Sequence, residues 1–118
     1  MHNFKKMDIW NLAVDLSLEI YRITKNFPRE EVFGLTSQIR RACISIPSNI
    51  AEGSGRSTNN DFKNFLHISL GSLRETECQL TIAEKLNYTN NINLNEIKDK
   101  IDILGGKISK FISLISDV

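Results

Sequence analysis

Apolar and small residues recur every three or four positions through four stretches of this chain, and this spacing constrains its fold more than any other feature. Such spacing gives one side of a helix a seam of the kind that lines helical bundles. The seam residues, in four groups along the chain, are Ile9, Ala13, Leu16, Ile20, Ile23 and Phe27; Leu35, Ile39, Ala42, Cys43, Ile46 and Ile50; Phe62, Leu66, Ser69, Leu73, Thr76, Leu80 and Ala83; and Leu94, Ile97, Ile101, Leu104, Ile108, Phe111, Ile115 and Val118. No stretch alternates with period two over the length of a strand.

Start and stop signals divide the chain into four helices joined by short links. The first helix ends before Pro28, because a residue that precedes proline is pushed out of the α region. The helices are expected over about 7–26, over about 35–52, from after the N-cap Thr58, and from after the N-cap Asn93. The prediction is an all-α, up-down four-helix bundle that residues 1–118 form as a single domain.

Pro47 lies inside the apolar pattern of the second helix. Proline lacks a backbone N–H and crowds the carbonyl four residues earlier, here that of Cys43, at a cost of about 3 kcal/mol or more in a helix interior. We therefore expect the second helix to be kinked at Pro47 or to restart there. The hydroxyl groups of Ser45 and Ser48 are expected to bond the carbonyls that the kink frees.

Gly105 and Gly106 lie inside the fourth helix, where each costs roughly 1 kcal/mol relative to alanine. Two explanations stay open. The glycines allow close packing against a neighbouring helix, or they allow a local bend.

The chain carries almost no net charge. Fifteen basic residues face fourteen acidic ones, so no overall field attracts nucleic acid or an anionic membrane.

Cys43 and Cys78 lie among apolar residues at helical positions and are expected to be reduced thiols in the core. The first residues have no apolar run of a signal peptide, and no segment approaches 18 apolar residues. We expect a soluble cytoplasmic protein with no membrane partner.

The sequence shows no pattern of catalytic or metal-binding residues. His67 has Asn64 three residues before it, so the Glu-x-x-His pair that binds metal in di-iron bundles is missing, and His67 is expected at the surface or its boundary. Neither cysteine has a histidine nearby in the sequence. The prediction is therefore a protein that is not an enzyme, with no catalytic residue, metal, cofactor or small-molecule substrate.

Polar residues gather on one side of the second helix, and we call them the polar ridge. They recur at three- and four-residue spacing and are Gln38, Arg41, Ser45, Ser48, Asn49 and Glu52. One interpretation is a solvated face. The other is a subunit interface, because small polar side chains let another backbone come close and satisfy hydrogen bonds there. The predicted subunit interface consists of the polar ridge and Pro47.

Basic residues near the same helix define a second candidate site. The run from Gly53 to Thr58 resembles half of a phosphate-binding loop, but it lacks the preceding strand and the Lys-Ser/Thr ending, so a turn between helices explains it more simply. Two adjacent arginines without interleaved aromatic residues are a weak signal for nucleic acid. The predicted nucleic-acid contacts are Arg40, Arg41, Arg56 and Lys63.

The second helix also carries a family likeness. The runs Gln38–Ala42 and Ser45–Gly53, followed by Arg56, resemble the hallmark of the four-helix bundle proteins named for intervening sequences in 23S rRNA genes. The other matching positions are Trp10, Tyr21, Phe27, Pro28, Phe65, Leu66, Gly71, Ser72, Leu73, Glu75, Glu77, Leu80, Ala83, Leu86, Asn87 and Tyr88. Cys43 departs from the pattern, where a small aliphatic residue or alanine is expected.

The resemblance implies a bundle that assembles into a homopentameric ring or barrel, in a family with no established enzymatic activity. A similar bundle is the accessory protein of diversity-generating retroelements, a basic pentamer that binds nucleic acid and a reverse transcriptase. This chain has a net charge of only +1, which weakens that analogy for RNA binding but not for assembly. The predicted function is a non-catalytic scaffold or interaction module that forms a homopentamer. The alternative is an accessory protein that binds rRNA or another structured RNA or DNA.

Overall fold

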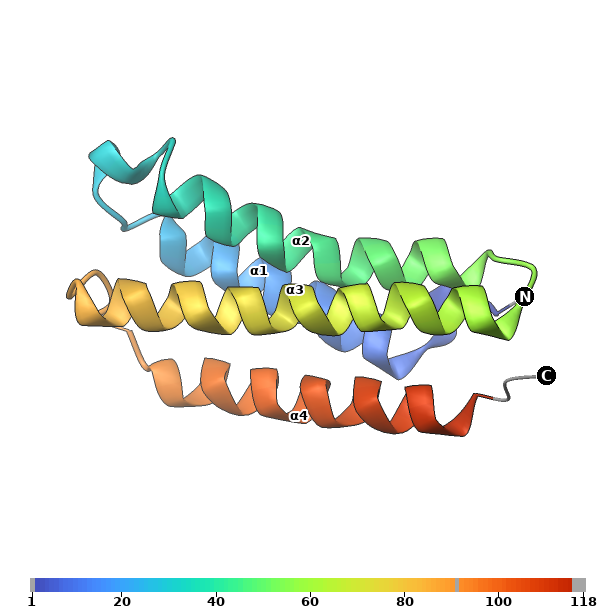
Figure 1. Ribbon diagram of the computed structural model, residues 1–118. Helices are drawn as coiled ribbons and strands as arrows, with labels where there is room; N and C mark the ends of the chain where they lie inside the picture. The colour runs from blue at the N-terminus through green and yellow to red at the C-terminus, as the bar shows by residue number, and fades with distance from the viewer. Residues whose placement is uncertain (1, 91, 116–118) are drawn as a thin grey trace.

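The computed structural model describes residues 2–90 and 92–115. Its elements are the 3-10 turn η1 (Phe4–Lys6), helix α1 (Asp8–Thr24), the 3-10 turn η2 (Arg29–Glu31), and helices α2 (Leu35–Ser54), α3 (Asn59–Lys85) and α4 (Leu94–Leu114) (Figure 1). No strand occurs in these described ranges. The predicted all-α fold with four helices is therefore confirmed, while Val118, the last residue of the predicted fourth seam, lies outside the described residues.

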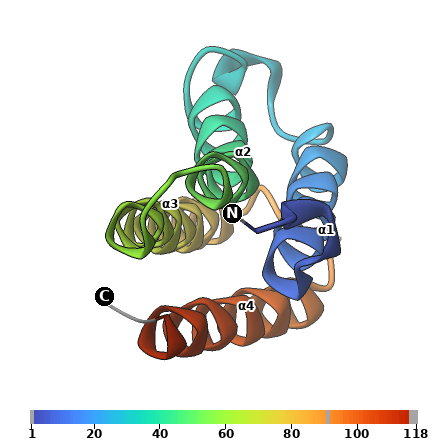
Figure 2. The same ribbon diagram turned by 90° about the vertical axis from the view of Figure 1, so that its right-hand side faces the viewer.

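The four helices surround one core. Each helix packs against its neighbours in sequence, and α4 also packs against α1, whereas α1 with α3 and α2 with α4 are diagonal pairs (Figure 2). The helices lie along the long dimension of a molecule that measures 48 × 26 × 20 Å. In Figure 1, α2 and α4 run in one direction and α3 runs in the other.

The seam residues fill the space between the helices. One fully buried example from each helix is Leu16, Ile39, Leu66 and Ile101. At one end of the bundle the Phe62 ring meets the Phe111 ring edge-on, with 5.7 Å between the ring centroids. Full burial of an aliphatic or aromatic side chain contributes about 1.5–3 kcal/mol, so these seams are the main source of stability.

Side-chain caps begin α3 and α4 where the sequence predicts them. The hydroxyl of Thr58 accepts a hydrogen bond from the Asp61 amide at 3.1 Å. The Asn93 side chain accepts one from the Asn95 amide, also at 3.1 Å. Both bonds satisfy amides that a helix start leaves without a partner.

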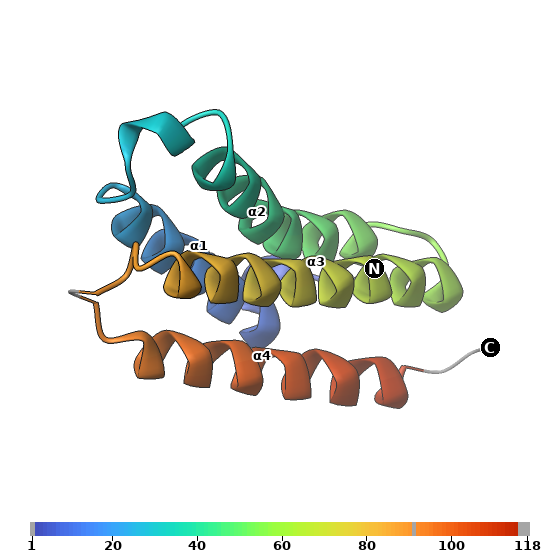
Figure 3. The same ribbon diagram turned by 60° about the vertical axis from the view of Figure 1, so that its left-hand side comes forward.

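Helix α2 continues through Pro47, so the predicted restart at this residue is wrong. The ribbon of α2 changes course along its length in Figure 3, and the kink at Pro47 itself stays a prediction. The carbonyl of Cys43, which lacks its helical donor because residue 47 is proline, accepts a hydrogen bond from the Ser17 hydroxyl at 3.1 Å. The expected role of Ser45 and Ser48 is therefore wrong, since a residue of α1 supplies the missing donor.

The two glycines of α4 have different surroundings. A Cβ atom on Gly105 would lie 2.6 Å from Nη2 of Arg74 and 3.4 Å from Cδ2 of Leu73, both on α3. A Cβ atom on Gly106 would meet nothing within 4 Å. Gly105 therefore packs against side chains of α3, of which the nearest is the movable end of Arg74, whereas packing does not explain Gly106. Helix α4 runs unbroken through both glycines.

The two cysteines also differ. Cys43 is fully buried, and its thiol donates to the Arg40 carbonyl at 3.2 Å. Burial raises the pKa of the Cys43 thiol to about 11. Cys78 is exposed, so its predicted place in the core is wrong. It lies five residues after the buried Leu73, which turns it to the opposite side of α3.

This difference predicts one reactive thiol in the native protein. At about pH 8 a thiol reagent is expected to modify Cys78 quickly and Cys43 only after unfolding, because the thiolate is the reactive form. The raised pKa of Cys43 also makes the free energy of unfolding depend on pH. Its stabilising contribution is fully present below pH 9.0, the ordinary pKa of the thiol, and is lost as the pH rises toward 11. Mass spectrometry of the labelled protein checks the first result, with Cys78→Ser as the control. Equal labelling rates for both thiols would contradict it.

Candidate interaction surface on helices α2 and α3

Part of the polar ridge joins α2 to α3 within the same chain. The hydroxyl oxygens of Ser45 and Ser72 lie 2.9 Å apart, within hydrogen-bonding distance. The side-chain amide of Asn49 donates to the backbone carbonyl of Ser45 at 2.7 Å and to its hydroxyl at 2.8 Å. Beside them, the Ser69 hydroxyl donates to the Ile46 carbonyl at 2.7 Å. Ser45 is therefore a half-buried residue that joins the two helices, and the half-buried Asn49 binds to Ser45 within α2.

Gly53 lets α2 and α3 approach closely at the other end of the ridge. A Cβ atom at this position would lie 2.6 Å from Cβ of Phe65 and 2.9 Å from Cδ1 of Phe62. Both contacts are shorter than side chains tolerate, so only glycine fits without a shift of one helix. The prediction that Gly53 belongs to a turn is wrong, because this residue lies inside α2 and is buried.

The other members of the polar ridge are exposed. They are Gln38, Arg41, Ser48 and Glu52. Pro47 is half-buried and lies two positions after Ser45, which turns it about 160° away around the helix. The structure thus places six of the seven predicted interface residues along the α3 side and the outer side of α2, and Pro47 at the edge that faces α1.

A row of apolar residues on α3 borders the exposed ridge. Ile68, Ile82 and Leu86 are 52%, 44% and 49% exposed, and Phe65 at the start of the row is half-buried. Polar members of the same row include Gln79, which is 7% exposed and whose Oε1 accepts no hydrogen bond within the described residues. An unpaired buried acceptor costs about 1–3 kcal/mol.

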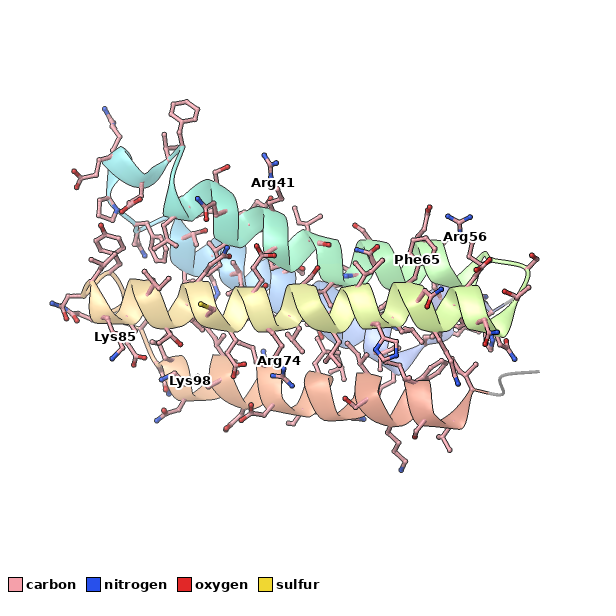
Figure 4. All side chains as sticks on the ribbon, viewed as in Figure 1. Arg41, Arg56, Phe65, Arg74, Lys85 and Lys98 are labelled. Atoms are coloured by element: carbon pink, nitrogen blue, oxygen red, sulfur yellow. The ribbon has the colours of Figure 1, made fainter. Side chains whose placement is uncertain are left out.

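We call this surface the α2–α3 face. It consists of the exposed ridge residues Gln38, Arg41, Ser48 and Glu52 together with Phe65, Ile68, Ile82 and Leu86. Figure 4 shows Arg41, Arg56 and Phe65 on the same side of the α2–α3 pair. The α3 half is not among the predicted interface residues, although the spacing of residues 65, 68, 72, 75, 79, 82 and 86 repeats at three and four positions.

The predicted nucleic-acid contacts do not form one patch. Arg40 donates from Nε to the Thr24 hydroxyl at 2.8 Å and stacks 4.6 Å above the Tyr21 ring. Arg56 pairs with Glu52 at 3.2 Å and stacks 4.6 Å above the Phe65 ring. Lys63 is half-buried and takes part in an interaction within the molecule.

Arg41 differs from the other three basic residues. It is exposed, points away from α2 (Figure 4), and forms no ion pair or hydrogen bond with any residue that the structure describes. Its charge is therefore available to a ligand or a partner, whereas Arg56 is paired with Glu52 and Arg40 uses two of its five N–H donors within the chain.

The described residues contain no group of three or more histidine, cysteine or acidic side chains placed to hold a metal ion. His67 is exposed, as predicted. Among the same residues, no helix has the combination of length and hydropathy that crossing a bilayer requires.

Comparison with protein-family models matches this chain to a family. The comparison with curated proteins returned no match. The family model described as 23S rRNA-intervening sequence protein matches residues 5–110, a span that includes α1, α2, α3 and most of α4. The chain therefore belongs to the family of 23S rRNA-intervening sequence proteins.

Proposed function

We propose that this chain assembles with identical copies through the α2–α3 face and works as a non-catalytic scaffold or interaction module. The observation that carries the proposal is the row of exposed apolar side chains on α3. Ile68, Ile82 and Leu86 are each about half exposed on one side of one helix. Exposed apolar side chains with polar residues between and beside them are typical of a protein interface.

The polar part of the face supports the same function. Ser48 and Gln38 are exposed and uncharged, and Arg41 has no partner among the described residues. Arginine is enriched at interfaces, where its planar group pairs with carboxylates and carbonyls. A neighbouring chain would thus find apolar area at the α3 row and hydrogen-bonding groups at the ridge.

A ring needs two different surfaces on each chain, because the α2–α3 face of one copy must meet another surface of the next. Exposed apolar residues elsewhere provide candidates for that second surface. Leu18 of α1 is 64% exposed, and Ile103 and Leu114 of α4 are 53% and 74% exposed. The number of copies in the proposal is five, which is what the family resemblance implies.

Light scattering after size-exclusion chromatography tests the assembly. The wild-type protein at micromolar concentration is expected to have a mass five times the 13.4 kDa of one chain. Ile68→Glu is expected to lower that mass toward one chain, because it places a charge in the apolar row at a cost of several kcal/mol when buried. The matched control is Thr81→Glu, which adds the same charge to an exposed position on the other side of α3.

Two results would contradict the proposal. A wild-type mass of 13.4 kDa would exclude self-assembly under these conditions. A loss of assembly in Thr81→Glu but not in Ile68→Glu would place the interface away from the α2–α3 face. Circular dichroism of each variant separates a loss of assembly from a loss of folding.

The nucleic-acid alternative has less support. Of its four residues, Arg41 alone is both exposed and without a partner among the described residues. A ring would repeat this charge around its axis, and several weak contacts can then add up to useful avidity. We keep assembly as the proposed function because the apolar row has no role in binding phosphates.

A further inference from the structure

A hollow of about 430 Å³ lies where α1 ends and α2 begins, on the α1 side of α2. Its walls include the basic residues Lys25, Arg29 and Arg40, and no acidic residue lines it. Phe27 and Val32 form the apolar part of its walls. The hollow is larger than one small anion and lies within the range of sites that hold small molecules, about 300–1,000 Å³.

The Arg40 side chain is held in place before any ligand arrives. Its Nε donates to Thr24 at 2.8 Å, its Nη2 donates to the Tyr21 carbonyl at 3.4 Å, and the Tyr21 ring lies beneath the guanidinium. A guanidinium carries five N–H donors, and these two bonds leave three of them unused. A fixed guanidinium with free donors loses little entropy when it binds an anion.

Thr36 adds a second unused donor to the hollow. This residue is 6% exposed and lines the wall, yet its hydroxyl forms no hydrogen bond with any residue that the structure describes. The hydroxyl oxygen is not fully enclosed by the protein, so an anion in the hollow can accept a hydrogen bond from it.

The charges around the hollow favour an anion. Lys25 and Arg29 are exposed and form no ion pair within the described part of the chain. Glu31 follows Arg29 closely, but its carboxylate accepts bonds from the Leu35 amide at 3.1 Å and the Tyr88 hydroxyl at 2.8 Å, which holds it outside the walls. Glu30 is exposed and also lies outside the walls.

The C-terminal end of α1 opposes an anion, because the last carbonyls of a helix carry partial negative charge. Three of these carbonyls already accept hydrogen bonds. Arg40 donates to the carbonyl of Tyr21. The backbone amide of Asn26 donates to the carbonyl of Ile23 at 3.3 Å, and the backbone amide of Phe27 donates to the carbonyl of Thr24 at 3.1 Å. The partial negative charge at the end of α1 is thus reduced, and the positive charges of Lys25, Arg29 and Arg40 outweigh it.

We propose that this hollow binds a phosphate group carried by a phosphorylated small molecule or by a nucleic acid. Phosphate matches the site better than a carboxylate, because it offers three or more acceptor oxygens and up to two negative charges to three cations and a hydroxyl. The site is separate from the α2–α3 face, so it does not depend on assembly through that face.

Titration followed by amide NMR spectra tests the proposal. The probes are inorganic phosphate, a nucleoside monophosphate, a single-stranded oligonucleotide and, as the anion control, acetate. Saturable shifts are expected at Thr36, Arg40 and their neighbours with phosphate-bearing probes at about 10 mM or below, and not with acetate at the same ionic strength. Saturation by the monophosphate identifies a small-molecule source of the phosphate, and saturation by the oligonucleotide alone identifies nucleic acid.

Variants separate the site from general charge. Arg40→Gln is expected to weaken phosphate binding by about tenfold or more, since it removes a prearranged donor group. Arg29→Gln is expected to weaken it by roughly threefold, and because Arg29 has no intramolecular ion pair among the described residues, the fold should be unaffected. Lys85→Gln removes the same charge from an exposed position at the C-terminal end of α3, which lies at the same end of the bundle as the hollow but outside its walls (Figure 4), and is expected to leave binding nearly unchanged.

Three outcomes would overturn the proposal. They are the absence of a saturable shift with every phosphate-bearing probe, equal binding of acetate, and an equal loss of binding in Arg29→Gln and Lys85→Gln.

Discussion

Gly53→Leu is expected to lower the free energy of unfolding by about 2–3 kcal/mol, with a fall in melting temperature of roughly 10 °C. The physical reason is the close approach of α2 and α3. A Cβ atom at residue 53 would lie 2.6 Å from Cβ of Phe65, an atom fixed to the backbone of α3, so one helix must move. Leucine gains about 0.8 kcal/mol of helix propensity over glycine, which offsets only part of this cost.

Gly106→Leu is the matched control, because a Cβ atom there meets nothing within 4 Å. It is expected to stabilise the protein by up to about 0.8 kcal/mol, the gain in helix propensity alone. Chemical denaturation of both variants, followed by circular dichroism, gives the two free energies. If Gly53→Leu were as stable as Gly106→Leu, the α2–α3 contact at Gly53 would not be as close as described.

Ser17→Ala is expected to cost about 1–3 kcal/mol, because it leaves the buried carbonyl of Cys43 without a donor. The Ser17 hydroxyl also lies 3.0 Å from the Ala13 carbonyl, but that carbonyl keeps its helical partner. The carbonyl of Cys43 lacks one because residue 47 has no N–H. The loss should therefore depend on Pro47.

A double-mutant cycle measures that dependence. In a Pro47→Ala background the amide of residue 47 can donate to the carbonyl of Cys43, so the further change Ser17→Ala is expected to cost less than about 0.5 kcal/mol. The coupling between the two sites would then be about 0.5–3 kcal/mol. The same loss in both backgrounds would show that the Ser17 bond to Cys43 contributes little.

The sequence was sufficient to predict much of the fold, because each of its signals acts locally. Heptad spacing identified the buried seams, and Thr58 and Asn93 begin helices as N-caps. Spacing alone also identified the outward members of the polar ridge, such as Arg41 and Glu52. Each of these features depends on residues within about one turn of each other.

The features that were missed depend on contacts between distant residues. The donor to the Cys43 carbonyl comes from Ser17, 26 residues earlier, and local sequence gave no reason to prefer it to Ser45. Gly53 looked like part of a turn until α3 was placed against it. Cys78 was misplaced because apolar neighbours suggested burial, whereas its helical angle relative to Leu73 turns it outward.

The serine contacts between α2 and α3 have a consequence for how the two helices align. Seams that repeat every seven residues would still match if one helix slid past the other by one repeat, about 10.5 Å. The bonds from Ser69 to the Ile46 carbonyl and between Ser45 and Ser72 form at one alignment only. Apolar packing therefore brings the two helices together, and the hydroxyl groups of Ser45, Ser69 and Ser72 select a single register between them.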